Sequence, residues 1–320
     1  MTPYEVIHAC GETESKKSKM ALIDEHTSKV LKGILRLALD PFTIYIDKGY
    51  ELKFAEPMEH TEGFDYNWKY AVHLVKSLSS KLVKAEDLDK TIFDTSANLN
   101  GEQQDILHRI LTKDLKCGVT AKMVNKDKKG IPTFKVQEAM RPEKAEVSEI
   151  AFPSMVEPIH KGIRCIILTK NKEAFYHSTD GTVLENLNKF SEEILILCGG
   201  RNLMFDCIIT GIDEKDVKKK AKKKLKGKCV LLDVMPTSAF QRGACTIAQG
   251  SRIATLREIY FDSPERDTNR VKLVKGKLCN NIKDVEKYLK KMKAKGHANV
   301  IVKDLKAPYT FGESGSWIIL

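Results

Sequence analysis

The pattern of apolar residues changes near the middle of this sequence, and that change most constrains the fold. Up to about residue 140 the apolar residues recur at helical spacing. In "YAVHLVKSLSSKL" (70–82) the positions that share one helix face are Ala71, Leu74, Val75, Leu78 and Leu82. Beyond residue 153 the apolar residues fall instead into short runs of strand length. The sequence therefore predicts two domains of different class.

Local signals support helices in the first part. In "GEQQDILHRILTKDL" (101–115) one face carries Ile106, Leu107, Ile110 and Leu111. Asn100 is placed to cap this helix, with Glu102 and Asp105 near its positive end. A tight turn at Gly118 and a short helix capped by Thr120 are expected to follow.

The second part predicts an α+β domain. Its strand-like runs are "RCIILT", "EAFYHS", "LMFDCIIT", "CVLLDVM", "VKLVKG", "NVIVKD" and "SWIIL". A helix is expected at 281–296, with a stripe of Val285, Leu289 and Met292 ended by Gly296. Irregularly spaced strands and helices favour antiparallel sheets. With 139–153 as a charged, proline-containing linker, we predict an all-α domain over 1–145 and an α+β domain over 146–320.

The composition indicates the compartment and the kind of partner. No run approaches eighteen apolar residues, and the N-terminus lacks the apolar core of a signal peptide. The eight cysteines show no metal-ligand spacing, so we expect reduced, mostly buried thiols in a cytoplasmic or nuclear compartment. The net charge of +11 either attracts polyanions such as nucleic acid or reflects a lysine-rich solvated surface.

The order of several segments resembles that of the ATP-dependent DNA ligases of large, T-even-like phages. The segments, in order, are "LTKDLKCGVTAKMVNK", "FPSMVEPIHKGIRC", "SRIATLREI" and "NNIKDVEKYLKKMKAKGHANVIVKD". The resemblance runs from about residue 30 to the end. It implies a helical DNA-binding domain followed by a nucleotidyltransferase domain of the DNA-ligase adenylation type. Ligases of this kind continue into an OB-fold domain, which has no counterpart before Leu320.

The resemblance also implies a chemistry. In that family the lysine of Lys-x-Asp-Gly-x-Arg attacks the α-phosphate of ATP to form lysyl-AMP, which then adenylates the 5′-phosphate of a nick. This reaction needs an activated amine, a carboxylate that holds a divalent metal, and cations that neutralise the phosphates.

This chain departs from the family at the nucleophile. In "IHKGIR" the spacing back from Arg164 places Ile159 at the nucleophile position and Lys161 at the position of the motif aspartate. Gly162 and Arg164 keep the family residue types. Isoleucine has no lone pair and cannot form a phosphoramidate. Lys161 is the fallback nucleophile, because residues two apart on an extended segment share a face.

Other positions of the family pocket are also altered. The ribose-contacting arginine becomes Thr179, and Glu313 stands where arginine is usual. The metal-associated glutamate becomes Ile208, the adenine-stacking aromatic residue becomes Leu232, and Ala298 and Asn299 replace Glu-Gly. One triphosphate-facing lysine becomes Ile319. The residual pocket would comprise Gly162, Arg164, Leu232 and Lys303.

These replacements predict a site without nucleotidyl transfer. Aliphatic side chains cannot offset the desolvation of a triphosphate, so no catalytic residue is intact and no cofactor or metal is predicted. The acids that remain, Asp206 and Asp233, are interpreted as strand-end or turn residues. Arg164 is expected to pair with a nearby carboxylate, and His160 to be a solvated loop residue.

Two lysine clusters coincide with regions that contact DNA in the family. One surrounds the Gly118 turn, and the other is "KDVKKKAKKKLKGK" (215–228), with nine lysines against one aspartate. The predicted phosphate-binding residues are Lys113, Lys116, Lys122, Lys126, Lys128, Lys129, Lys218, Lys219, Lys220, Lys222, Lys223 and Lys224. The alternative interpretation is a mobile surface loop.

Two hypotheses of function follow. In the first, the protein is a degenerate ligase, a monomer that binds duplex or nicked DNA and forms no lysyl-AMP. In the second, it is an active ATP-dependent DNA ligase that uses ATP and Mg²⁺, with Lys161 or another lysine as nucleophile.

Overall fold

A computed structural model describes residues 1–46, 50–59, 63–125, 130–141, 150–213, 217, 227–263 and 270–320. The chain divides into two compact units, Met1–Thr133 and Phe134–Leu320. We call them unit 1 and unit 2. The expected linker overlaps residues 142–149, which lie outside the described residues.

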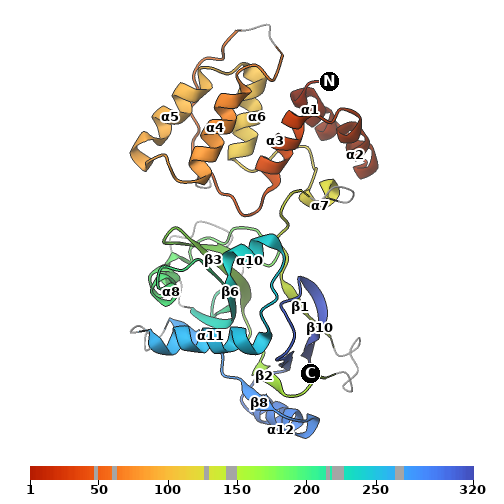
Figure 1. Cartoon of the computed structure of the whole chain (residues 1–320), viewed down its shortest axis with the longest axis vertical. Helices are drawn as coiled ribbons and strands as arrows, with labels where there is room; N and C mark the ends of the chain where they lie inside the picture. The colour runs from red at the N-terminus through yellow and green to blue at the C-terminus, as the bar shows by residue number, and fades with distance from the viewer. Residues whose placement is uncertain are drawn as a thin grey trace. The chain divides into compact units, whose positions relative to one another are not determined.

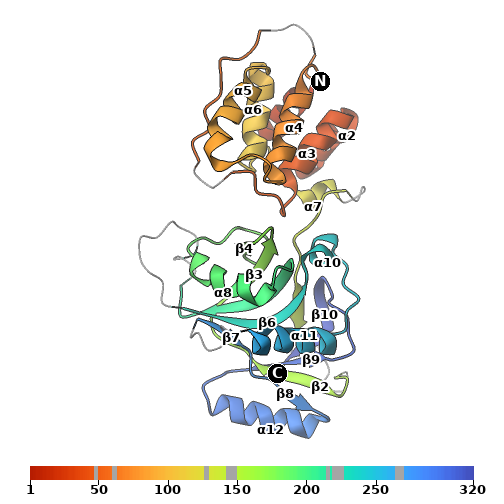
Figure 2. The ribbon, with the colours of Figure 1, turned by 60° about the vertical axis from the view of Figure 1, so that its left-hand side comes forward.

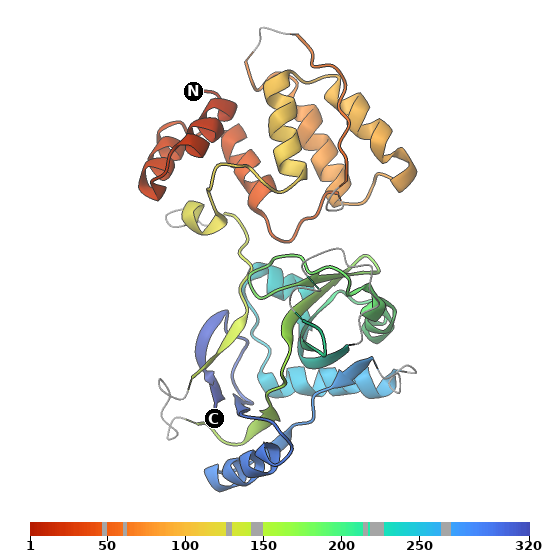
Figure 3. The same cartoon turned by 180° about the vertical axis from the view of Figure 1, so that it is seen from behind.

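Unit 1 contains helices and, in its described residues, no strand (Figures 1 and 3). The helices are α1 (Pro3–Glu12), α2 (Lys16–Glu25), α3 (Lys29–Leu39), α4 (Trp68–Ser79), η1 (Ala85–Asp87), α5 (Leu88–Ser96), α6 (Gly101–Leu111) and α7 (Ala121–Val124). Their apolar faces meet in one core, to which Leu31, Leu74, Ile92, Leu107 and Ile110 contribute.

The predicted helix signals of unit 1 are confirmed, with one exception. Asn100 caps α6 in a capping box with Gln103, and the Thr120 side chain accepts a hydrogen bond from the Met123 amide at the start of α7. Gly118 has a φ of 66°, which suits the expected turn. The prediction was wrong for Leu82, which lies beyond the end of α4 and is 76% exposed. The chain leaves the helix before it, with Lys81 in the left-handed region.

Unit 2 contains two five-stranded sheets (Figure 2). Sheet A has the order β1 (Gln137–Met140), β10 (Gly312–Ile319), β9 (Val300–Asp304), β2 (Ser154–Pro158) and β8 (Lys277–Cys279). Sheet B has the order β4 (Glu173–His177), β3 (Ile163–Lys170), β5 (Leu203–Thr210), β6 (Lys228–Pro236) and β7 (Val271–Leu273).

Antiparallel pairing dominates both sheets, as predicted. The parallel pairs are β1 with β10 and β6 with β7. Each of the seven predicted strand segments overlaps a strand, and none of the seven covers β1, β2 or β8. The remaining helical elements among the described residues are η3 (Asn188–Phe190), α8 (Ser191–Cys198), α10 (Thr237–Arg242), α11 (Gln249–Asp262) and α12 (Ile282–Lys293). Tyr288 belongs to the buried stripe of α12, whereas Leu289 is half-buried.

Alternation along the strands gives each sheet one apolar face and one face with charged residues. Phe205 and Cys207 of sheet B pack in an apolar core with residues of α8 and α11. Val156 and Val302 of sheet A pack with the buried stripe of α12. The opposite face of each sheet carries the polar side chains described below.

Two further properties concern both units. Within the described residues, no helix has both the length and the apolar character needed to cross a bilayer. All eight cysteines are buried, as predicted. Burial in the apolar core of sheet B raises the pKa of the Cys207 thiol well above its ordinary value.

Candidate functional site

The loop between β2 and β3 holds Ile159 and Lys161, the two residues at which the sequence predicts a nucleophile position or its fallback. Ile159 directly follows β2 and is half-buried. Its amide donates to the Asn299 carbonyl at 3.1 Å, and its carbonyl oxygen lies 3.1 Å from His297 Nδ1. Lys161, two residues on, is exposed. The main chain at Ile159 is therefore held to the segment that precedes β9.

Gly162 is required by close packing alone. A Cβ atom at this residue would lie 2.3 Å from the Ile209 carbonyl oxygen and 2.7 Å from Ile208 Cγ2. Both distances are shorter than real Cβ contacts, and one of the atoms belongs to the backbone. The glycine of the motif therefore allows β3 to approach β5 whether or not a nucleotide binds.

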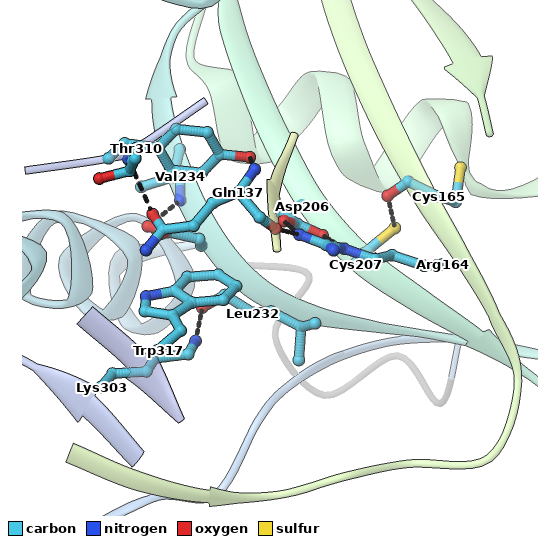
Figure 4. Close-up of polar contacts among 12 residues, drawn as sticks. Gln137, Arg164, Cys165, Asp206, Cys207, Leu232, Val234, Lys303, Thr310 and Trp317 are labelled. Carbon is cyan, nitrogen blue, oxygen red and sulfur yellow. Dashed lines mark hydrogen bonds and ion pairs between the residues drawn. The ribbon is translucent and has the colours of Figure 1, made fainter. Parts of the chain in front are cut away.

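Arg164 forms a two-pronged ion pair with Asp206 (Figure 4). Its Nε donates to Oδ1 at 3.0 Å and its Nη2 to Oδ2 at 2.6 Å. Nη2 also donates to the Gln137 carbonyl at 2.6 Å. Although burial favours the neutral form, the neighbouring Asp206 carboxylate holds the pKa of Arg164 above its ordinary value. The expected pairing of Arg164 with a nearby carboxylate is confirmed.

Asp233 is paired in the same manner by a helix. Arg252 of α11 donates to it through Nε at 3.0 Å and through Nη2 at 3.0 Å. Gln249 Nε2 donates to Oδ2 at 3.2 Å. The interpretation of Asp206 and Asp233 as strand-end or turn acids was wrong, because both lie inside strands and have 0% exposure. A carboxylate can be buried in the middle of a strand when the guanidinium of an arginine pairs with it through two hydrogen bonds.

Lys303 and Glu157 form the third buried pair. The ammonium of Lys303 lies 2.7 Å from Glu157 Oε2, and the two side chains are 1% and 3% exposed. Burial raises the pKa of Glu157, an effect that Lys303 opposes. Lys303 Nζ also donates to the Leu232 carbonyl at 3.1 Å. This carbonyl is available because β6 bulges against β5: Asp206 pairs with Asp233, and Cys207 pairs with Leu231.

Trp317 of β10 joins the three pairs. Its Nε1 donates to Gln249 Oε1 at 2.7 Å. The Lys303 ammonium lies 4.4 Å from the centre of its ring, and the Arg164 guanidinium lies 5.8 Å from it. Figure 4 shows the indole between Lys303 and the Arg164–Asp206 pair. The two sheets are therefore bridged by hydrogen bonds and cation–π contacts.

We call these residues the ionic cluster: Gln137, Glu157, Arg164, Asp206, Asp233, Gln249, Arg252, Lys303 and Trp317. Its three cations each contact one of its three carboxylates, so its formal charges sum to zero. A triphosphate needs cations and donors to replace its water, and a divalent metal needs carboxylate oxygens. In this arrangement the charged groups of the cluster already satisfy one another.

The other predicted pocket residues are dispersed around the cluster. Ile208 is half-buried and pairs in register with Arg164, and Ile319 is half-buried at the end of β10. Leu232 is half-buried in the bulge. Ala298 is exposed in the loop before β9. Among the described residues, no group of three or more histidine, cysteine, aspartate or glutamate side chains is arranged to hold a metal ion.

His160 departs from expectation. It is half-buried rather than solvated, and its ring packs edge-on against His297 with 5.1 Å between the ring centres. Burial lowers the pKa of His160, and the neighbouring His297 lowers it further.

Only some of the predicted DNA-binding lysines lie within the described residues. Lys113 points into unit 1, where its ammonium donates to the carbonyls of Leu37 at 3.0 Å and Asp40 at 2.5 Å. Burial lowers the pKa of Lys113 to about 8. Lys116 and Lys122 are exposed. Outside the described residues lie Lys126, Lys128, Lys129, Lys218, Lys219, Lys220, Lys222, Lys223 and Lys224.

Several members of the cluster were not predicted from the sequence. Gln249 and Arg252 lie on the buried side of α11 with Leu256 and Ile259. Polar residues that share the helical spacing of buried apolar residues could have indicated a buried polar contact. Glu157 and Trp317 gave no comparable signal, because their partners are distant in sequence.

Comparison with known proteins extends this description. No protein-family model and no curated protein matches the sequence. Two solved structures described as "Pmar-Lig_PreS3" and "Pmar-Lig_Pre." each cover 100% of this chain and 78% of their own chain, at a TM-score of 0.57. Their identities to this chain are 19% and 20%. The ATP-dependent DNA ligase from bacteriophage T7 in complex with ATP covers 58% of this chain and 68% of its own, with 15% identity and a TM-score of 0.46. The likeness to the two Pmar-Lig structures shows a ligase-like fold.

Proposed function

We propose that this protein is a degenerate DNA ligase, which binds duplex or nicked DNA and does not form lysyl-AMP. The proposal that no lysyl-AMP forms rests on the ion pairs within the ionic cluster. Arg164, Lys303 and Arg252 are each held by a carboxylate at 3.0 Å or less. ATP would have to separate these pairs, and each separation leaves a buried charge without its partner.

The isoleucine at position 159 also supports the proposal that no lysyl-AMP forms. A phosphoramidate requires a nitrogen nucleophile, and Ile159 supplies none. Lys161 remains the alternative nucleophile, which would make the protein an active ligase. Its side chain is exposed, whereas lysine nucleophiles are activated by desolvation or by neighbouring cations. The degenerate form is therefore the better-supported proposal.

The proposed binding of DNA rests on the positive charge of the chain. The chain carries 54 lysines and arginines against 43 acids, and two of its lysine-rich segments match DNA-contacting segments of the ligase family that it resembles. Contacts to phosphates release condensed counterions, so the affinity must fall as salt rises. A surface that reads phosphates alone would bind duplexes of different sequence equally well.

Titration of labelled nicked and intact duplexes with the protein tests the proposed DNA binding. With about five lysines on phosphates, raising salt from about 50 mM to about 200 mM should lower the affinity by about 500-fold. The variant Lys116→Gln/Lys122→Gln should flatten the salt slope by about 1.8, at about 0.9 per phosphate contact. The matched control, Lys170→Gln/Lys172→Gln, removes two exposed lysines from the β3–β4 turn and should leave the slope unchanged. Negligible affinity, or affinity that does not respond to salt, would contradict the proposal.

A further inference from the structure

The outer face of α12 is strongly basic, and it belongs to neither lysine cluster that the sequence singled out. The helix packs on sheet A through Val285, Tyr288 and Met292. Figures 1 and 2 show it along the outside of the sheet, beside β8 and β2. The ionic cluster uses the opposite face of the same sheet, so the two features are separate.

Lysines fill the solvent side of this helix at helical spacing. The exposed lysines from 283 to 295 are Lys283, Lys287, Lys290, Lys291, Lys293 and Lys295. Lys283, Lys287 and Lys290 follow an i, i+4, i+7 pattern, which places them on one line along the helix. Of the two acids in α12, Asp284 is half-buried and accepts a hydrogen bond from the Asn280 amide. Glu286 is exposed.

Helix stability explains this pattern only in part, through the acids Asp284 and Glu286 at i, i+3 or i, i+4 spacing. Cations stabilise the last turn of a helix, where Lys290, Lys291 and Lys293 lie. Lys283 lies in the first turn, where a cation opposes the helix dipole. Like charges at i, i+4, such as Lys283 with Lys287 and Lys287 with Lys291, also destabilise the helix. A bound anionic partner would offset this repulsion, because each lysine would then lie near an opposite charge.

We infer that the basic face of α12 binds the phosphate backbone of a nucleic-acid duplex. The helix has 12 residues and so extends for about 18 Å, against about one phosphate charge per 1.7 Å of duplex axis. An anionic membrane is a poorer fit, because surface-bound helices insert an apolar face and the apolar face of α12 is buried against sheet A. The inference rests on the proposed DNA binding and assigns part of that binding to α12.

The segment that follows α12 contacts the loop between β2 and β3, which holds the predicted nucleophile position. Beyond α12, His297 contacts the Ile159 carbonyl, and its ring packs against His160. Lys161 is exposed in the same loop. A duplex along α12 would therefore extend toward the loop in which a ligase carries its nucleophile, while the side chains of the ionic cluster remain buried on the other side of sheet A.

Charge removal on α12 tests the inference. The variant Lys283→Gln/Lys287→Gln/Lys290→Gln should fold with an unchanged or slightly higher melting temperature, because exposed like charges are removed. Its duplex affinity at low salt should fall more than tenfold, and its salt slope should flatten by about 2.7. The control Lys170→Gln/Lys172→Gln/Lys306→Gln removes the same net charge from exposed positions on two turns and should change affinity less than threefold.

The outcomes separate the inference from the proposed function. If the wild type binds duplex and both variants weaken it equally, net charge alone explains binding and the inference is wrong. If wild type and α12 variant bind equally well, the inference fails and the proposed function stands. If the wild type does not bind duplex, both fail. Binding of wild type to phosphatidylserine vesicles but not to duplex, lost in the α12 variant, would assign the face to a membrane instead.

Discussion

Replacing Arg252 with methionine is expected to lower the free energy of unfolding of unit 2 by about 3 to 5 kcal/mol. The change leaves the Asp233 carboxylate at 0% exposure with only the weaker donors Gln249 Nε2 and the Val234 amide. A buried charge that loses its partner pays the full desolvation cost, which exceeds the loss of the attraction itself. Denaturant unfolding would measure the change. In a Trp68→Phe background, the fluorescence comes from Trp317, which contacts Gln249 in the same cluster.

A matched control and a double variant identify the cause. Arg257→Met alters an exposed arginine of the same helix and should change the free energy of unfolding by less than about 0.5 kcal/mol. The double variant Arg252→Met/Asp233→Asn should be more stable than Arg252→Met, because the stranded charge is gone. If Arg252→Met and Arg257→Met were equally mild, Asp233 would not depend on its arginine.

Replacing Lys303 with methionine should also cost about 3 to 5 kcal/mol near pH 8, and here the loss depends on pH. Without the ammonium, the pKa of Glu157 in the folded chain lies well above its unfolded value of about 4.3, because burial then meets only the weaker opposing effect of Arg257. The folded variant then binds more protons than the unfolded chain above pH 4.3, so its stability falls as pH rises toward the folded pKa. The deficit relative to the wild type should be smaller at pH 5 than at pH 8.

Unfolding of both proteins at the two pH values measures that difference. Lys306→Met, an exposed lysine in the turn after β9, is the control and should show no such pH dependence. A deficit of the same size at both pH values would mean that Glu157 does not titrate between them. The ion pair with Lys303 would then have a smaller energetic role than its burial implies.

The elements of this fold were largely predictable because their signals are local. The helix at 101–111 has its cap, its first-turn acid and its apolar stripe within one short segment. Strands such as β5 and β9 are recognisable as short apolar runs. The end of α4 was misplaced, because Leu82 continued the apolar spacing after the backbone had left the helix.

The site could be predicted only in part. The motif spacing assigns Ile159 to the nucleophile position, which stays a prediction, whereas the expected pairing of Arg164 with a carboxylate is confirmed. The partner of Lys303 could not, because Glu157 and Lys303 are far apart in sequence and come together through the pairing of β2 with β9. The same holds for Trp317 and Gln249, which lie 68 residues apart and meet between the sheets. Such contacts depend on strand order, which local patterns do not determine.

Incubation with ATP labelled on its α-phosphate, in the presence of Mg²⁺, tests the central claim most directly. Denaturation and acid–base treatment would then distinguish a covalent lysyl-AMP from bound nucleotide, with an active ATP-dependent ligase as the positive control. The closed ion pairs and the isoleucine at 159 predict no labelled protein. A labelled adduct, abolished in Lys161→Arg or mapped to another lysine, would contradict the account and identify the protein as a working nucleotidyltransferase.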